Sequence, residues 1–213
     1  MKHRTIVSLS LIALAAASQA QTTFFDNFTG YNWNGQWIIG GTGSPQPQFV
    51  AQQFTSQATG SVTDVTVSFF KESLSPTGGG QVSILADNAN TVGALMGSVA
   101  FADSTAYSFS GPNTNMLTVS GLNIGLTAGQ KYWLQITGDV MTSGRWTFEV
   151  GASSGDPGLS AWNQGAGYNY TSIGLATMKV EGVPEPASVA ALAAGLMGIA
   201  ARSRRRRAKR TPS

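Results

Sequence analysis

Side chains able to do covalent chemistry are scarce in this sequence. It contains no Cys, and its one His is His3. A Ser-His-Asp or Cys-His nucleophile, or a zinc site of imidazole or thiolate, therefore has no residues to use beyond the first positions. Two carboxylates at the right separation can still hydrolyse a glycosidic bond. No spacing singles out a pair among Asp64, Asp87, Asp103, Asp139, Glu149 and Asp156, so we expect a protein that is not an enzyme.

Two short stretches offer hard oxygen ligands for calcium, Asp26-Asn27 and Asp87-Asn88-Ala89-Asn90. The second departs from the helical calcium-loop pattern at its third position, Ala89. Asp and Asn also form turns by hydrogen bonding to the nearby backbone. We therefore expect turns and no cofactor here, with calcium as the alternative.

Aromatic side chains are the main candidates for binding. They form two groups among Asn and Gly residues. Aromatic faces beside amide side chains can stack on sugar rings, which predicts a carbohydrate-binding module. Alternatively, the rings pack over the edges and open ends of the fold. The six candidates are Tyr31, Trp33, Trp37, Trp162, Tyr168 and Tyr170.

The formal net charge of +3 does not describe the middle of the chain. Nine of the 13 basic residues lie within the first four or the last twelve positions. Residues 21–182 hold four basic and nine acidic residues, a net charge of −5. An acidic body gains little from electrostatic attraction to phosphate, so we expect no nucleic-acid partner.

Residues 1–20 have the layout of a secretory signal peptide. A basic start ends at Arg4, an apolar run extends from Thr5 to Ala17, and small residues occupy Ser18 and Ala20. This three-part pattern predicts export through the general secretion machinery and cleavage between Ala20 and Gln21. An uncleaved N-terminal anchor or a buried helix is the alternative.

The C-terminus carries a second apolar run, Ala187 to Ala201, directly before a basic tail. As a helix the run is about 22 Å long, short of the roughly 30 Å hydrocarbon core. Local thinning of the bilayer and long Arg side chains can compensate, so we expect a single transmembrane helix at 187–201. Positive charge stays in the cytoplasm, which places the body outside it; a nucleic-acid or nuclear-localisation patch is the alternative. The basic residues are Arg202, Arg204, Arg205, Arg206, Arg207, Lys209 and Arg210.

Together with the preceding Val183-Pro184-Glu185-Pro186, this order of features resembles the PEP-CTERM sorting domain. In that family an exosortase, a membrane-embedded processing enzyme of Gram-negative bacteria that make exopolysaccharide, recognises the tail. The resemblance implies that Pro184, Glu185 and Pro186 are the recognition element and that the basic residues act as a cytoplasmic stop. The two prolines also forbid helix and hold Glu185 extended.

The body between these ends alternates apolar and polar residues over short runs. In one run Val65, Val67 and Phe69 share a face, and similar runs cover 131–136, 145–150 and 176–181. Period two predicts half-buried strands, and turn formers separate the runs. Further strands are predicted at 49–55, 81–86, 95–101 and 116–122. Eight or nine strands without helix predict an all-β fold, a single antiparallel β-sandwich of the jelly-roll kind.

Residues 49–138 of the body also resemble the choice-of-anchor extracellular domains, most closely the type called R. The resemblance rests on Gln53-Phe54, on the stretch from Val82 to Asp87, and on the stretch from Leu126 to Leu134. These domains are small extracellular units that bacteria attach to alternative surface anchors, and they have no assigned catalytic residues.

Three parts are thus predicted: a signal peptide (1–20), an extracellular β-sandwich (21–182) and a sorting signal (183–213, with motif 183–186, helix 187–201 and basic tail 202–213). We expect an exported, non-enzymatic surface or extracellular-matrix protein that an exosortase processes and that is associated with exopolysaccharide or biofilm. Its body is periplasmic while the tail is in the membrane, and finally at the cell surface or extracellular. The alternatives are a carbohydrate-binding module for exopolysaccharide, and a polysaccharide-active glycosidase or lyase.

Overall fold

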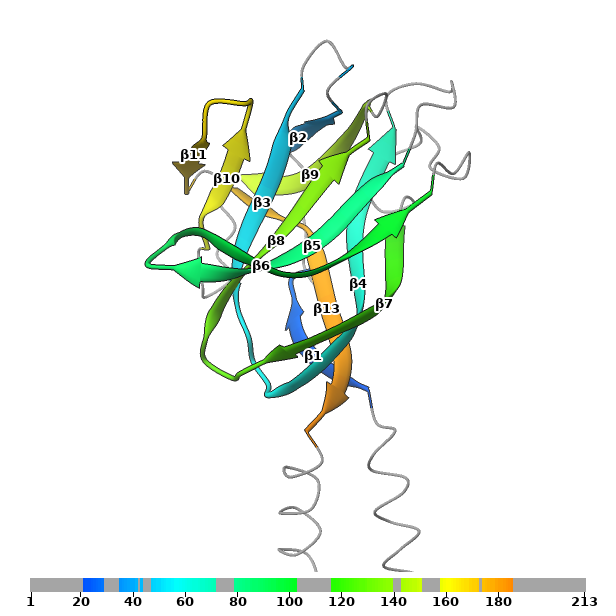
Figure 1. The fold of residues 1–213 in the computed structure, drawn as a ribbon, viewed down its shortest axis with the longest axis vertical. Helices are drawn as coiled ribbons and strands as arrows, with labels where there is room; N and C mark the ends of the chain where they lie inside the picture. Colours follow the sequence, from blue (N-terminus) through cyan, green and yellow to red (C-terminus); the bar gives the residue numbers. More distant parts are fainter. Residues whose placement is uncertain are drawn as a thin grey trace, which may run out of the picture. The chain divides into compact units, whose positions relative to one another are not determined.

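Thirteen β-strands and no helix make up the residues that the computed structural model describes, which are 21–28, 35–41, 43, 47–71, 79–102, 116–139, 143–150, 158–172 and 174–185 (Figure 1). Residues Thr23–Gly182 form the compact unit considered below. The strands are β1 (Thr22–Asp26), β2 (Gly35–Gly40), β3 (Phe49–Thr55), β4 (Gly60–Lys71), β5 (Gly80–Asn88), β6 (Thr91–Phe101), β7 (Met116–Leu126), β8 (Lys131–Gly138), β9 (Ser143–Val150), β10 (Ser160–Asn163), β11 (Tyr168–Thr171), β12 (Gly174–Ala176) and β13 (Met178–Pro184).

The strands form two antiparallel sheets. One has six strands in the order β11-β10-β3-β8-β5-β6. The other has seven, with β1-β13-β4-β9-β12 side by side, β2 paired with β9 and β7 paired with β4. The chain passes from one sheet to the other at β2–β3, β3–β4, β4–β5, β6–β7, β7–β8, β8–β9, β9–β10 and β11–β12. The predicted all-β antiparallel sandwich is therefore confirmed.

The predicted terminal elements cannot be compared with this fold. The signal peptide (1–20) and the transmembrane helix (187–201) lie outside the described residues. Within the part that is described, no helix is long and apolar enough to cross a membrane.

Apolar and polar residues alternate along the strands, and the apolar side chains of both sheets pack into one shared core. Val65, Val67 and Phe69 of β4 are fully buried, as period two predicts. They belong to the same apolar cluster as Leu134 and Ile136 of β8, in the other sheet. Each such side chain contributes about 1.5–3 kcal/mol by leaving water, so this face holds the sandwich together.

A fully buried amide, Gln52 of β3, connects the two sheets. Its Oε1 accepts a hydrogen bond from the backbone N–H of Ala176 on β12 (3.0 Å) and one from the hydroxyl of Ser160 on β10 (2.7 Å). Its Nε2 donates to the carbonyl of Leu159 (3.2 Å). Because an unsatisfied buried polar group costs about 1–3 kcal/mol, any other pairing of β3 with β10 would be penalised.

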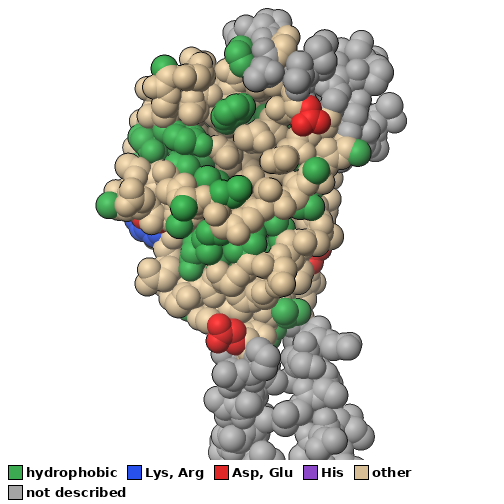
Figure 2. Space-filling model, in the orientation of Figure 1, with side chains coloured by type: hydrophobic (Ala, Val, Ile, Leu, Met, Phe, Trp, Pro, Cys, Tyr) green, Lys and Arg blue, Asp and Glu red, His purple; other side chains and the backbone are tan. Residues whose placement is uncertain are grey.

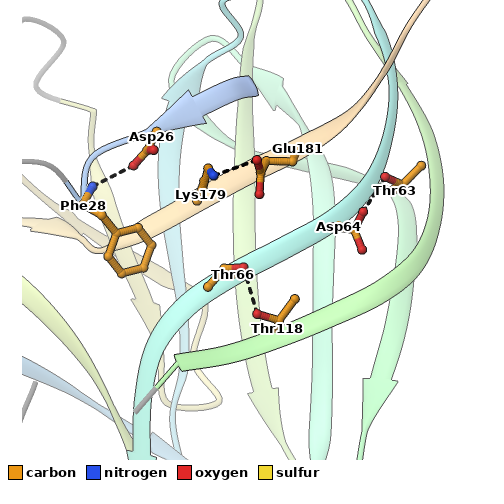
Figure 3. Close-up of polar contacts among 8 residues, drawn as sticks. All are labelled: Asp26, Phe28, Thr63, Asp64, Thr66, Thr118, Lys179 and Glu181. Carbon is orange, nitrogen blue, oxygen red and sulfur yellow. Dashed lines mark hydrogen bonds and ion pairs between the residues drawn. The ribbon is translucent and has the colours of Figure 1, made fainter. Parts of the chain in front are cut away.

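The outer face of the seven-stranded sheet is polar (Figure 3). Thr66 and Thr118 form a cross-strand hydrogen bond of 3.0 Å between β4 and β7. On β13, Lys179 Nζ lies 2.7 Å from Glu181 Oε1, and on β4 Asp64 accepts a hydrogen bond from Thr63. Partly exposed pairs of this kind contribute about 1 kcal/mol at most, so they add little to the stability of the fold.

The outer face of the six-stranded sheet differs, because it carries a second apolar cluster. Trp133 of β8 is fully buried. This is unexpected, because the alternation of the strand points its side chain to the face of the sheet away from Tyr132 and Leu134. Its neighbours in the cluster include Leu85, and the ring of Tyr170 on β11 lies 5.8 Å from it in an edge-on arrangement. The interpretation of residues 131–136 as half-buried was therefore incomplete: β8 is covered on both faces.

Asp87 ties the β5–β6 hairpin to this second cluster. Its Oδ1 accepts hydrogen bonds from Gln53 Nε2 (2.6 Å) and Trp133 Nε1 (2.8 Å), and its Oδ2 accepts one from the backbone N–H of Asn90 (3.0 Å). Burial raises the pKa of Asp87, but these hydrogen bonds and the positive charge of Lys131 outweigh burial and hold the pKa below its usual value.

The hairpin turn itself is strained at one residue. Ala89 and Asn90 have positive φ angles of 51° and 65°, as a two-residue type I′ turn requires. Asn tolerates this region, whereas Ala does not.

Replacement of Ala89 by Gly is expected to stabilise the protein by about 1 kcal/mol, because Gly adopts positive φ without steric cost. Denaturant unfolding measures the change. The matched control is Ala94→Gly on the exposed strand β6, which is expected to destabilise by about 0.5–1 kcal/mol. Equal effects at the two positions would contradict the turn assignment.

The hydrogen bonds to Asp87 predict a pH-dependent contribution to stability. Since folding lowers its pKa, the contribution is full above the ordinary pKa of about 3.9 and is lost as the pH falls through the lower folded value. Asp87→Asn is expected to cost about 1 kcal/mol or more at pH 6. The difference from the wild type should shrink between pH 5 and pH 2, and a difference independent of pH would refute the role of the carboxylate.

Candidate binding surface and sorting motif

The register of β10 decides which predicted aromatic residues face outward. Trp162 pairs with Val50 of β3, and both lie with the core between the sheets. Asn163, the next residue, pairs with Phe49 on β3 and with Tyr168 on β11. Because successive side chains point to opposite faces of a sheet, Phe49, Asn163 and Tyr168 share the outer face of the six-stranded sheet.

Trp37 and Trp162 pack against each other from opposite sheets. Their rings are stacked with centroids 5.4 Å apart, and Trp37 also lies 5.1 Å from the ring of Phe148. Trp37 Nε1 is buried and has no hydrogen-bond partner among the described residues. The two clusters that the sequence separates therefore meet here, and both Trp side chains contact the main core.

The other aromatic candidates divide into two groups. Tyr31 and Trp33 lie outside the described residues. Tyr168 and Tyr170 lie on the outer face with ring centroids 6.3 Å apart, and 37% of Tyr170 is exposed. The Tyr170 hydroxyl accepts a hydrogen bond from the backbone N–H of Val92 (3.1 Å), which joins β11 to β6.

Tyr168 is held more deeply than Tyr170. Gln135 Nε2 donates a hydrogen bond to its hydroxyl. Burial is the main cause that raises the pKa of Tyr168, so the phenol stays protonated and neutral over the physiological range.

A shallow hollow of about 220 Å³ opens on the same face, where β3 begins and β10 ends. Its lining comes from the start of β3 and from the β10–β11 turn, where Gly165 and Gly167 have φ of 99° and 104° and so require glycine. The lining residues are Pro47, Phe49, Asn163, Gln164 and Gly165. Phe49, Asn163 and Gln164 are not among the site residues predicted from the sequence, since only strand pairing brings them together.

The outer face of the six-stranded sheet carries few charged side chains (Figure 2). Figure 2 views it from the side of β3, β5 and β6 and shows patches of hydrophobic side chains separated mainly by uncharged polar groups. An apolar, largely uncharged surface with amide groups suits a neutral polar ligand better than a charged one.

In the two stretches considered for calcium, side-chain oxygens accept hydrogen bonds from N–H groups of the protein. Both carboxylate oxygens of Asp87 accept N–H hydrogen bonds, and Asp26 Oδ1 accepts one from the backbone of Phe28 (2.9 Å). Asn27 Oδ1 accepts the N–H of Met178 (2.8 Å), which fastens β1 to β13. In the part of the chain that the structure covers, no three His, Cys, Asp or Glu side chains are grouped as metal ligands.

Two of the acids that could form a catalytic pair, Asp64 and Asp87, lie on opposite faces of the sandwich. Asp64 lies on the outer face of the seven-stranded sheet and Asp87 on that of the six-stranded sheet. Asp139 is exposed after β8. Asp103, Asp156 and the side chain of Glu149 lie outside the described residues.

The predicted sorting motif begins within the last strand. Val183 and Pro184 end β13, 37% of Val183 is exposed, and Glu185 follows as an exposed residue. Pro186 and the predicted basic stop at 202–210 lie outside the described residues, as does Ala20 of the predicted cleavage site, whereas Gln21 is exposed.

Comparison with known proteins gives a match at the C-terminal end of the chain. Residues 182–206 match the family model described as the PEP-CTERM protein-sorting motif. No curated protein matches the chain, and the resemblance of the body to choice-of-anchor domains stays a prediction. The matched motif implies export, transient membrane anchoring in a Gram-negative bacterium and processing by an exosortase. The chain therefore carries a PEP-CTERM protein-sorting motif at residues 182–206.

Proposed function

We propose that this protein is an exported, non-enzymatic component of the cell surface or extracellular matrix, associated with exopolysaccharide. The observation that carries the proposal is the PEP-CTERM motif at 182–206, which begins where the β-sandwich ends. The general secretion machinery delivers the chain, the body lies in the periplasm while the tail is in the membrane, and the exosortase then removes the tail.

The position of the motif supports access by a processing enzyme. Glu185 is exposed and directly follows Pro184, the last residue of β13. Proline cannot continue a hydrogen-bonded ladder through its own nitrogen, and the residue before a proline favours an extended backbone. With a proline on each side, Glu185 is presented as extended chain, the form in which proteolytic enzymes bind substrates.

A structural role for the body, without catalysis, is supported by how its polar groups are used. Asp87 accepts hydrogen bonds from three N–H donors, and Asp64 accepts hydrogen bonds from Ser120 and Thr63 that lower its pKa. A general acid in glycoside hydrolysis needs the opposite, a raised pKa. A polysaccharide-active glycosidase or lyase is therefore the least supported candidate.

A carbohydrate-binding module is the second candidate, favoured by the outer face of the six-stranded sheet. The 220 Å³ hollow lined by Phe49 and Gln164 lies on this face, and the partly exposed Tyr170 lies on the same face, two residues beyond the partner of Asn163 on β11. Aromatic faces and amides together match the apolar faces and hydroxyl groups of sugars. In this variant of the proposal, the sorting signal brings a polysaccharide-binding domain to the cell surface.

The sorting proposal predicts that Pro184→Ala combined with Glu185→Ala blocks processing. In exosortase-positive cells the wild type is expected outside the inner membrane without its C-terminal tail. At least about nine-tenths of the double variant should keep the tail and stay in the membrane fraction, as for a cleavage-site change costing about 1.4 kcal/mol or more of transition-state binding. Immunoblots of cell fractions measure both forms.

The control for this experiment is Glu181→Ala, which removes a partly buried acidic side chain of β13 four residues before Glu185. It should be processed like the wild type. Wild-type processing of the double variant would show that these two residues are not the recognition element.

A further inference from the structure

We propose that the hollow between the start of β3 and the end of β10 binds one neutral sugar ring of a polysaccharide chain. The inference rests on the carbohydrate-binding form of the proposed function and assigns the subsite within it. It also shifts the binding residues away from Trp37 and Trp162, whose rings pack between the sheets.

The lining of the hollow has the two kinds of surface that a sugar ring needs. Phe49 and Pro47 supply apolar surface, and the lining is predominantly apolar in area. Asn163 and Gln164 supply amide groups at its side. A pyranose has a C–H face that packs on an aromatic ring and hydroxyl groups that both donate and accept, as an amide does.

The volume of the hollow and the lack of charge in its lining restrict the kind of ligand that it can bind. About 220 Å³ is below the roughly 300–1,000 Å³ of pockets that enclose drug-sized ligands, so the hollow fits one ring of a longer chain. All five lining residues are uncharged. An acidic sugar would gain no ion pair there and would meet a body of net charge −5, which favours a neutral polymer.

The hollow is preorganised by the strands around it. Phe49 is at the start of β3, which lies between β10 and β8 in the sheet. Asn163 Oδ1 accepts the N–H of Gly165 (2.7 Å), and Gln164 Nε2 donates to Gln48 Oε1 (2.8 Å). Side chains that are already fixed lose little conformational entropy on binding, so even a shallow site can hold a ligand.

The same face offers a second contact for a chain that leaves the hollow. Tyr168 pairs with Asn163 across β10 and β11, and Tyr170 lies two residues further along β11. Since both tyrosines share the outer face with Phe49, a bound polysaccharide would run from β3 across β10 toward Tyr170.

The test is binding of the full-length chain, in mild detergent, to neutral polysaccharides (dextran, galactomannan and xyloglucan) and to anionic alginate, by affinity electrophoresis and calorimetry. We expect the wild type to bind at least one neutral polymer and to bind alginate more weakly. Phe49→Ala is expected to weaken binding about tenfold, the effect of about 1.4 kcal/mol. Gln164→Ala should weaken it about threefold, and because Gln164 is exposed this variant should fold normally.

Leu95→Ala is the matched control, since it removes an apolar side chain that is 60% exposed on β6. It should bind like the wild type, and unfolding temperatures establish that each variant is folded. Binding unaffected by Phe49→Ala and Gln164→Ala would overturn the subsite but leave carbohydrate binding standing. No binding to any polymer would overturn both, and stronger binding to alginate than to the neutral polymers would overturn the assigned ligand class; the sorting proposal is independent of all three outcomes.

Discussion

The hydrogen bonds of Gln52 are the constraint on which the arrangement of this sandwich depends. This buried amide joins β3 to β10 within one sheet and to β12 of the other. A slip of one residue would leave its groups unpaired in the core and would turn every side chain of β10 to the opposite face. The inward position of Trp162 and the outward position of Asn163 both follow from this pairing.

The two outer faces of the sandwich have different chemistry as a result. On the seven-stranded sheet, Thr66 hydrogen-bonds to Thr118 and Lys179 pairs with Glu181. On the six-stranded sheet, Trp133 is buried beneath Tyr170, and Asp87 receives its hydrogen bonds from groups around it. Binding is therefore best sought on the second face. The sorting motif, in contrast, acts as a substrate and requires only an accessible extended chain.

Sequence patterns predicted the parts of this protein that depend on local information. The run at 49–55 coincides with β3, and Val65, Val67 and Phe69 are buried as their period of two indicates. No sustained alternation marks β1, β2, β10 and β11, which are short, and the single run predicted at 176–181 merges the end of β12 with β13. Eight or nine strands are therefore expected from the sequence where thirteen are described. The burial of Trp133 and the hollow at Phe49 depend on β10 and β11, more than 20 residues away in the chain, and no local pattern could reveal them.

We infer that the terminal segments serve transport and that the acidic β-sandwich is the working protein. The most direct test is the intact mass of the wild-type protein recovered from outside producing cells. We expect a chain that begins at Gln21 and lacks the basic segment from Arg202 to Arg210. A protein recovered there that still carries this segment would contradict it.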